Sequence, residues 1–240
     1  MKKAGFILLA AVLLCTGCVS QGRTALLAQR DPIALVSISA NREINWKGED
    51  SASSGLAGLF SRRALRADPD QTFVSDAEDL ITVAERLIWE TLAESELINL
   101  AERDTILLSQ AYGEARLNRR QTQRGDLAPE GFRLIDSRDR TFPPALAEET
   151  GIQRSMFVEF NLDKVMRNGL GKSGTCGASV EMRVLILDAL GKGVFDRTFT
   201  AGSLSTIRVL AGRYSQSGLM ELFEEAIAGV LLEFLFYLGD

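Results

Sequence analysis

Three segments in the carboxy-terminal half alternate apolar and polar residues, and this feature most narrows the folds open to the chain. Residues 156–162, 180–187 and 195–200 carry the pattern, and a glycine-containing turn at residues 190–193 joins the last two. Alternation places like side chains on one face of a strand, which predicts an antiparallel meander with one packed face. Residues 217–238 then predict a long helix whose second half is apolar nearly all round. Such a helix is either buried on the meander, the favoured interpretation, or meets a partner or membrane.

Apolar patterns ahead of the meander predict further strands and helices. Residues 33–39 are rich in β-branched side chains after a proline, which predicts a strand. Residues 75–92 carry apolar side chains at three- and four-residue spacing, which predicts a helix with one apolar face. Shorter elements are expected as strands at residues 97–100 and 132–135 and as helices at residues 102–112 and 143–151, the last ended by Gly151. The expected fold class is therefore α/β (α+β): a mixed sheet with a carboxy-terminal antiparallel meander, helices packed on it and a long carboxy-terminal helix.

The domain organisation follows from where these patterns begin and break. We expect a single α/β domain at residues 33–240, carried on a polar tether at residues 18–32. The 240 residues are 46% hydrophobic and 25% charged, which suffices for a core that folds unaided. Residues 41–74 contain clustered serines, glycines and mixed charges, so we expect a loop insertion there.

The first eighteen residues predict an export signal. Lys2 and Lys3 precede an apolar run at residues 5–14, only half of the roughly 20 residues that a membrane-spanning helix needs. A basic start, a short apolar run and then small residues are the layout of a secretory signal peptide, here residues 1–17. The sequence Cys15-Thr16-Gly17-Cys18 resembles a bacterial lipobox, although that family usually has Leu where this chain has Cys15. A plain signal peptide or an anchor helix that contains cysteines is the alternative.

The lipobox resemblance implies a location for the mature protein. In that family Cys18 would be diacylated on its sulfur, cut on its amino side and acylated on the new amine. Two or three acyl chains, palmitate among them, anchor a protein stably to a membrane, whereas one chain is marginal. Val19 stands where lipoproteins retained at the inner membrane have Asp. The resemblance therefore implies a lipid anchor in the cell outer membrane, with the domain facing the periplasm.

Composition excludes several kinds of active site. The chain has no histidine, which excludes Ser-His-Asp and Cys-His catalysis and His-ligated metals. Three cysteines cannot make a four-cysteine site, so we expect no metal, no cofactor and no catalytic residue. Cys176 lies in a glycine-rich segment that we expect to be a loop. There a spectator thiol is favoured over a functional one, although pairing between chains stays open. The formal net charge of −5 disfavours broad nucleic-acid binding.

Two expected loops carry the candidate contact residues. The polar segment 118–131 holds an arginine cluster, which can bind phosphate or an anionic glycan, although a solvated charged loop is the commoner explanation. The insertion at residues 41–74 holds a short apolar group. These candidate partner contacts are Arg119, Arg120 and Arg124 in the first loop and Leu56, Leu59 and Phe60 in the second.

The order of elements resembles two families of lipoproteins. Ala101-Glu102-Arg103-Asp104 lies between two expected helices, and Ala147-Glu148-Glu149-Thr150-Gly151 precedes the first meander strand. Over residues 33–238 this order resembles the curli-secretion lipoproteins and the penicillin-binding-protein-activator lipoproteins, which share a TolB-amino-terminal-like α/β fold. The resemblance implies that fold and an envelope role.

Together these features predict a membrane-anchored, non-enzymatic periplasmic lipoprotein, an accessory or assembly factor that binds an envelope protein or glycan. The alternative is an oligomeric secretion-channel or membrane-inserting lipoprotein, and a homo-oligomer is open in either case. An enzyme is disfavoured because neighbouring carboxylates, such as those of Glu224 and Glu225, point in different directions on a helix.

Overall fold

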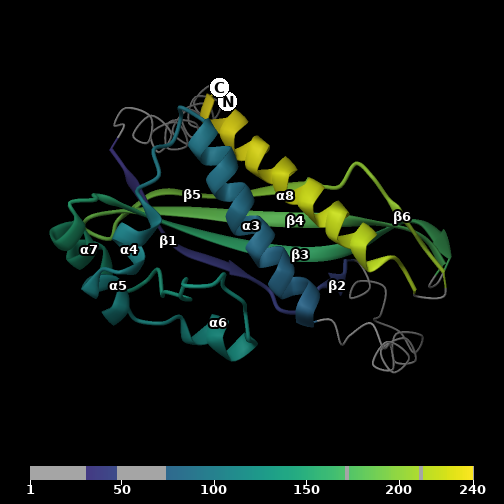
Figure 1. Cartoon of the computed structure of the whole chain (residues 1–240), viewed down its shortest axis with the longest axis horizontal. Coiled ribbons are helices and arrows are strands. Elements are labelled where there is room, and N and C mark those ends of the chain that lie inside the picture. Colours follow the sequence, from purple (N-terminus) through teal and green to yellow (C-terminus); the bar gives the residue numbers. More distant parts are fainter. Residues whose placement is uncertain (1–30, 48–73, 171–172, 211–212, 240) are drawn as a thin grey trace, which may run out of the picture.

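The computed structural model describes residues 31–47, 74–170, 173–210 and 213–239, which form a mixed sheet with helices on both faces (Figure 1). Cys18, the signal peptide and most of the tether lie outside the described residues, as do Leu56, Leu59 and Phe60.

The sheet has six strands and combines parallel with antiparallel pairs. Its main path runs β1-β3-β4-β5. β3, β4 and β5 form the predicted antiparallel meander, while β1 and β2 both join β3 in parallel and β6 joins β4 antiparallel. The predicted fold class is thus confirmed. The strand bounds are β1 Ile33–Ala40, β2 Asn45–Trp46, β3 Arg154–Leu170, β4 Ser173–Asp188, β5 Gly193–Gly202 and β6 Ile207–Val209.

Two meander strands are longer than predicted, and Cys176 lies in one of them rather than in a loop. β3 and β4 continue past the alternating segments, so that Cys176 pairs with Met166 within the ladder. The glycines that suggested a loop permit close backbone contact instead. Gly169 lies opposite Gly174, and a Cβ on Gly174 would collide with the carbonyl oxygen of Asn168.

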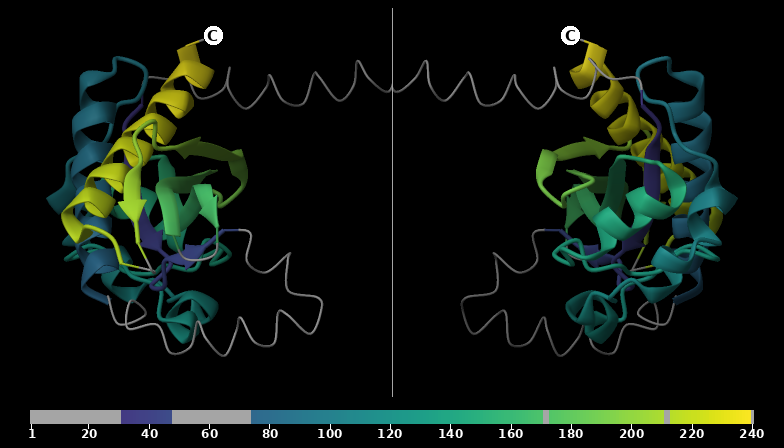
Figure 2. Two further views of the ribbon diagram at one scale, coloured as in Figure 1. Left: turned by 90° about the vertical axis from the view of Figure 1, so that its right-hand side faces the viewer. Right: turned by 90° about the vertical axis from the view of Figure 1, so that its left-hand side faces the viewer.

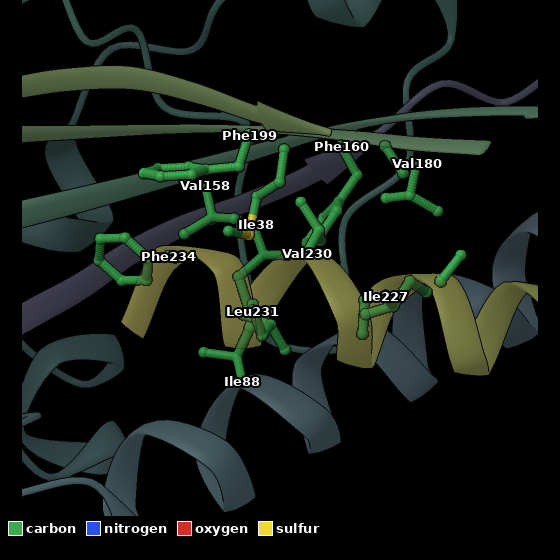
Figure 3. Close-up of a cluster of buried hydrophobic side chains, with 14 of the residues drawn as sticks. Ile38, Ile88, Val158, Phe160, Val180, Phe199, Ile227, Val230, Leu231 and Phe234 are labelled. Carbon is green, nitrogen blue, oxygen red and sulfur yellow. The ribbon is translucent and has the colours of Figure 1, made fainter. Parts of the chain in front are cut away.

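Two long helices cover one face of the sheet side by side (Figures 1 and 2). They are α3 Val74–Glu94 and α8 Gln216–Gly239. α8 packs on β4, β5 and α3, while α3 packs on β1. In the core between them, Leu231 of α8 lies next to Ile88 of α3, whereas Phe234 lies below the strands near Phe199 (Figure 3). The interpretation of the last helix as buried on the meander is therefore confirmed for this side of α8.

A second, smaller core lies on the opposite face of the sheet. Three short helices, α4 Arg103–Leu107, α5 Gln110–Glu114 and α7 Phe142–Thr150, cover that face where Ala34 and Phe157 are buried. The one helix predicted at residues 102–112 is two, because Ser109 accepts a hydrogen bond from the Tyr112 amide and caps a new start. α7 ends as predicted, since Gly151 adopts the left-handed conformation (φ 77°).

Three further local predictions were wrong. The expected loop at residues 118–131 contains a helix, α6 Arg119–Arg124, because the Asn118 side chain caps its amino end and Gly125 (φ 74°) ends it. In place of the expected strand at residues 97–100, the structure has a single bridge between Leu100 and Ile33. In place of the expected strand at residues 132–135, it has a single bridge between Ile135 and Leu117. Each of these segments meets its partner at one position only, so no ladder continues from it.

Candidate functional site

β5 forms an edge of the sheet whose outer side is open among the described residues. Its only strand partner there is β4. Just beyond β5, the Ser203 amide donates a hydrogen bond to the Ala178 carbonyl oxygen of β4. Hydrogen-bonded residues alternate along an antiparallel pair, so the backbone groups of residues 197, 199 and 201 bond to β4. The backbone N–H and C=O groups of Asp196, Thr198 and Thr200 therefore point outward. Such groups are a template for an additional strand.

A groove lies beside this edge, between β5 and the carboxy-terminal half of α8. Its volume is about 1050 Å³. Two of its side chains are large, apolar and solvent-exposed: Leu232 is 60% exposed and Phe236 70%. The groove is lined by Arg197, Thr198, Phe199 and Thr200 of β5 and by Gly229, Leu232, Glu233, Leu235, Phe236 and Tyr237 of α8.

The sequence of α8 explains why an apolar stripe stays exposed. Gly229, Leu232 and Phe236 recur at three- and four-residue spacing and so lie along one side of the helix. The sheet and α3 already take the side that carries Val230 and Phe234. At Gly229 an added Cβ would meet the Ala201 side chain at 3.3 Å, so this glycine lets the helix approach β5 closely.

Two aromatic residues that line the groove, Phe199 and Tyr237, connect it to the core and to its one cation. Phe234 makes edge contacts with the rings of Phe195 and Phe199, at centroid distances of 5.8 and 5.4 Å. The Arg197 guanidinium lies 4.0 Å from the centroid of the Tyr237 ring. This cation–π contact orients Arg197 along the groove. Glu233, the carboxylate of the groove, forms no ion pair with a described residue.

An ion pair on the opposite face of the sheet holds the edge strand to its neighbour. Arg183 of β4 donates to both carboxylate oxygens of Asp196, at 2.8 and 2.7 Å. These hydrogen bonds raise the pKa of the Arg183 guanidinium. The bidentate geometry fixes β5 laterally, so its outward backbone groups stay aligned.

The three arginines predicted as partner contacts lie on α6, away from the groove. Arg119 and Arg120 are exposed on α6, while Arg124 pairs with Asp126 at 2.5 Å and lies 3.5 Å from Glu159. α6 is joined to β1 through a hydrogen bond from Gln121 to Ser39. Because β3 and β4 separate β1 from β5, the arginines and the groove are on different sides of the domain.

Cys176 belongs to the core rather than to a site. Its side chain is fully buried on the face covered by α8, and its thiol lies 3.3 Å from the Gly177 carbonyl oxygen. Burial raises the pKa of the thiol, which disfavours the reactive thiolate. The pairing between chains that the sequence left open is therefore not available to this buried thiol in the folded domain.

The groove was not recognised in the sequence, although one signal for it was present. The helix at residues 217–238 is apolar on more sides than one sheet can cover, which allowed for a partner. Within the described ranges, no three His, Cys, Asp or Glu side chains come together in a way that could hold a metal ion. Nor does any helix in those ranges combine the length and hydrophobicity needed to cross a membrane.

Comparison with known proteins yields structural likenesses only. No protein-family model matches the chain, and no curated protein matches its sequence. Similar solved structures include a hypothetical protein of Chlamydia trachomatis (TM-score 0.36, 10% identity, 88% of this chain and 94% of that chain). A lipoprotein of Neisseria meningitidis is also similar (TM-score 0.33, 10% identity, 86% of this chain and 99% of that chain). So is the carboxy-terminal domain of LpoB from Salmonella enterica (TM-score 0.28, 10% identity, 71% of this chain and 82% of that chain). At these scores the likenesses do not transfer a function.

Proposed function

We propose that this protein is a non-enzymatic, lipid-anchored envelope protein that binds another protein through the edge of β5 and the adjoining groove. The observation that carries the proposal is the coincidence of an open strand edge with an exposed apolar stripe on α8. Either feature alone is common, whereas together they match the two requirements for adding a strand to a sheet.

Strand addition uses both features at once. The outward amides and carbonyls of Asp196, Thr198 and Thr200 would hydrogen-bond to the incoming backbone. Every second side chain of that strand would then point to the α8 side and cover Leu232 and Phe236. Burying such side chains contributes about 25 cal/mol per Å² of apolar surface, which favours a partner strand with apolar residues at alternate positions.

The anchor and the remaining contacts complete the proposal. The basic, apolar and small-residue order before Cys18 supports export and acylation of that cysteine, with the domain held at the outer membrane on its periplasmic side. In this position the protein would act as an accessory or assembly factor for an envelope partner. Arg119, Arg120, Leu56, Leu59 and Phe60 are proposed as secondary contacts.

Site-specific photo-crosslinking in intact cells tests the proposed binding surface. A photoreactive amino acid at Thr198 or Leu232 should give crosslinked protein products, and the same probe at Leu108, which is 83% exposed but distant from the groove, should give few. In the chain that carries the probe at Thr198, the substitutions Leu232→Glu and Phe236→Glu should abolish the crosslinked products. The matched control Leu190→Glu, at an 81% exposed leucine outside the groove, should leave them unchanged. Equal crosslinking from Leu108, or products that survive both groove substitutions, would refute the proposal.

A further inference from the structure

We propose that the partner of the β5 edge is a second copy of this chain, paired antiparallel about a two-fold axis at Thr198. This inference rests on the proposed function, because it assigns an occupant to the same surface. It joins two six-stranded sheets into one continuous sheet and places the two α8 helices on the same face. Two-fold dimers with an isologous interface of this kind are the commonest symmetric homo-oligomers.

The hydrogen-bonding phase of β5 restricts the registers that two copies can adopt. The outward backbone groups belong to the even-numbered residues Asp196, Thr198 and Thr200. A two-fold axis at Thr198 makes each Thr198 a hydrogen-bonded pair with its equivalent. It also makes Asp196 of each copy a hydrogen-bonded pair with Thr200 of the other. Every outward group at the centre of the strand then has a partner.

Charge decides among the neighbouring registers. An axis at Asp196 would set the two Asp196 side chains directly opposite each other, and an axis at Arg197 would do the same with the two arginines. Like charges directly opposite on paired strands are destabilising. An axis at Thr198 instead places Arg197 opposite Phe199. It also pairs residues 194–202 of β5, whereas an axis at Phe199 pairs only residues 196–202, so the longer pairing favours Thr198.

The position of α8 makes the apolar stripes meet. α8 crosses the strands obliquely (Figure 1), and its carboxy-terminal half lies at β5, where Gly229 approaches Ala201 and Tyr237 holds Arg197. A two-fold axis at Thr198 turns one α8 onto the same face of the joined sheet as the other and sets the two helices antiparallel. The two carboxy-terminal halves then lie on the two sides of the joined strands. Leu232 and Phe236, which border the edge, would become buried between the two copies.

The charges of the groove are compatible with self-association. Each copy contributes one arginine, Arg197, and one carboxylate, Glu233, so the joined surface carries no net charge from these groups. Arg197 is already held on the Tyr237 ring and Glu233 is exposed, so neither loses a described ion pair on association. A second copy therefore satisfies the backbone, apolar and charge requirements of the surface at once.

The mass and the register of the association are measured on the detergent-extracted full chain. Light scattering after size exclusion should give the mass of two chains, and Leu232→Glu should raise the dissociation constant by about tenfold or more. Oxidation of a Thr198→Cys variant should give a covalent dimer, because paired Cα atoms about 5.5 Å apart can be bridged by a disulfide. Thr200→Cys is the register control and should stay uncrosslinked, since equivalent Thr200 residues lie four positions apart along the paired strands. The unsubstituted chain, with Cys176 buried, should also stay uncrosslinked.

Several outcomes would overturn the inference. A monomeric mass at all concentrations, a ring-sized mass, or disulfide formation at Thr200 as readily as at Thr198 would each do so. If the chain is monomeric while the Leu232→Glu and Phe236→Glu substitutions still abolish crosslinks in cells, the second copy is wrong and the proposed function stands with another partner. If the same substitutions change neither measurement, both fail.

Discussion

At the scale of single residues, Tyr112 of the smaller core and Arg133 beside it form a hydrogen-bonded pair. The Tyr112 hydroxyl accepts a hydrogen bond from the Arg133 amide at 2.8 Å, and the Arg133 guanidinium donates to the Gly113 carbonyl oxygen at 2.6 Å. The Arg133 carbonyl oxygen in turn accepts from Ser37 of β1 at 3.0 Å. The pair therefore ties α5 to the sheet through a segment that contains no strand of its own.

The burial of Tyr112 predicts a loss of stability in alkaline solution. Burial raises the pKa of Tyr112 to about 12, from 10.0. A raised pKa means that the unfolded chain loses the phenolic proton first, so stability is complete below about pH 10 and falls between about pH 10 and 12. The contribution of this group to the loss is about 1 kcal/mol at roughly pH 11.

Chemical unfolding at a series of pH values measures this contribution. Tyr112→Phe should lower the free energy of unfolding at neutral pH, because the Arg133 amide loses its acceptor, and should flatten the alkaline decline. Tyr237→Phe, on α8, is the matched control and should retain the decline of the unsubstituted chain. An equally steep decline in Tyr112→Phe would show that other groups cause it.

At the scale of elements, α8 combines two functions on different sides. One side supplies the main core, where Phe234 is 1% exposed and contacts two rings of β5. The other side carries Leu232 and Phe236 and covers nothing among the described residues. A core helix needs only the first side, so the second requires its own explanation.

The two sides of α8 predict opposite results for substitutions two residues apart. Phe234→Ala should lower the free energy of unfolding by about 3–5 kcal/mol, because it leaves a cavity between α8 and β5. Phe236→Ala should change it by less than about 0.5 kcal/mol, because its ring is mostly in solvent. Both are measured by denaturant unfolding at low protein concentration, where association contributes least. A large effect of Phe236→Ala under these conditions would mean that its ring is buried within the single chain.

At the scale of the whole molecule, the described domain and the proposed amino-terminal anchor would work together. The proposed anchor at Cys18 would confine the groove to a layer near the membrane, because a tether of about 14 residues reaches at most roughly 45 Å. Confinement raises the local concentration of a surface that binds other anchored proteins, including further copies of this chain.

The anchor is tested by replacing the cysteines of the signal one at a time. Cys18→Ser should abolish incorporation of labelled palmitate and move the protein from the membrane to the soluble fraction. Cys15→Ser is the matched control and should retain both the label and the membrane association, because that residue lies in the segment to be removed. Undiminished labelling of Cys18→Ser would contradict the lipobox interpretation.

The predictions that were confirmed depend on short-range patterns. The alternation of residues 156–162 and 195–200 and the glycine after Thr150 act over a few residues, so they could be recognised without knowing the rest of the fold. The predictions that were wrong depend on distant partners. Cys176 lies in a strand because β4 continues beside β3 as far as the close contact between Gly169 and Gly174. Residues 97–100 do not form a strand because they meet only the start of β1.

The sequence by itself determined the fold class and the meander, because periodicity and capping are encoded in neighbouring residues. It also carries the pattern that predicts an export signal, on which the anchoring proposal rests. Only the tertiary structure decided that β5 is an edge and which side of α8 stays exposed. An apolar helix can bury any of its sides, and the choice is made by packing against β4, β5 and α3 rather than by the helix itself. The candidate site therefore became visible only when the strand order and the helix packing were known together.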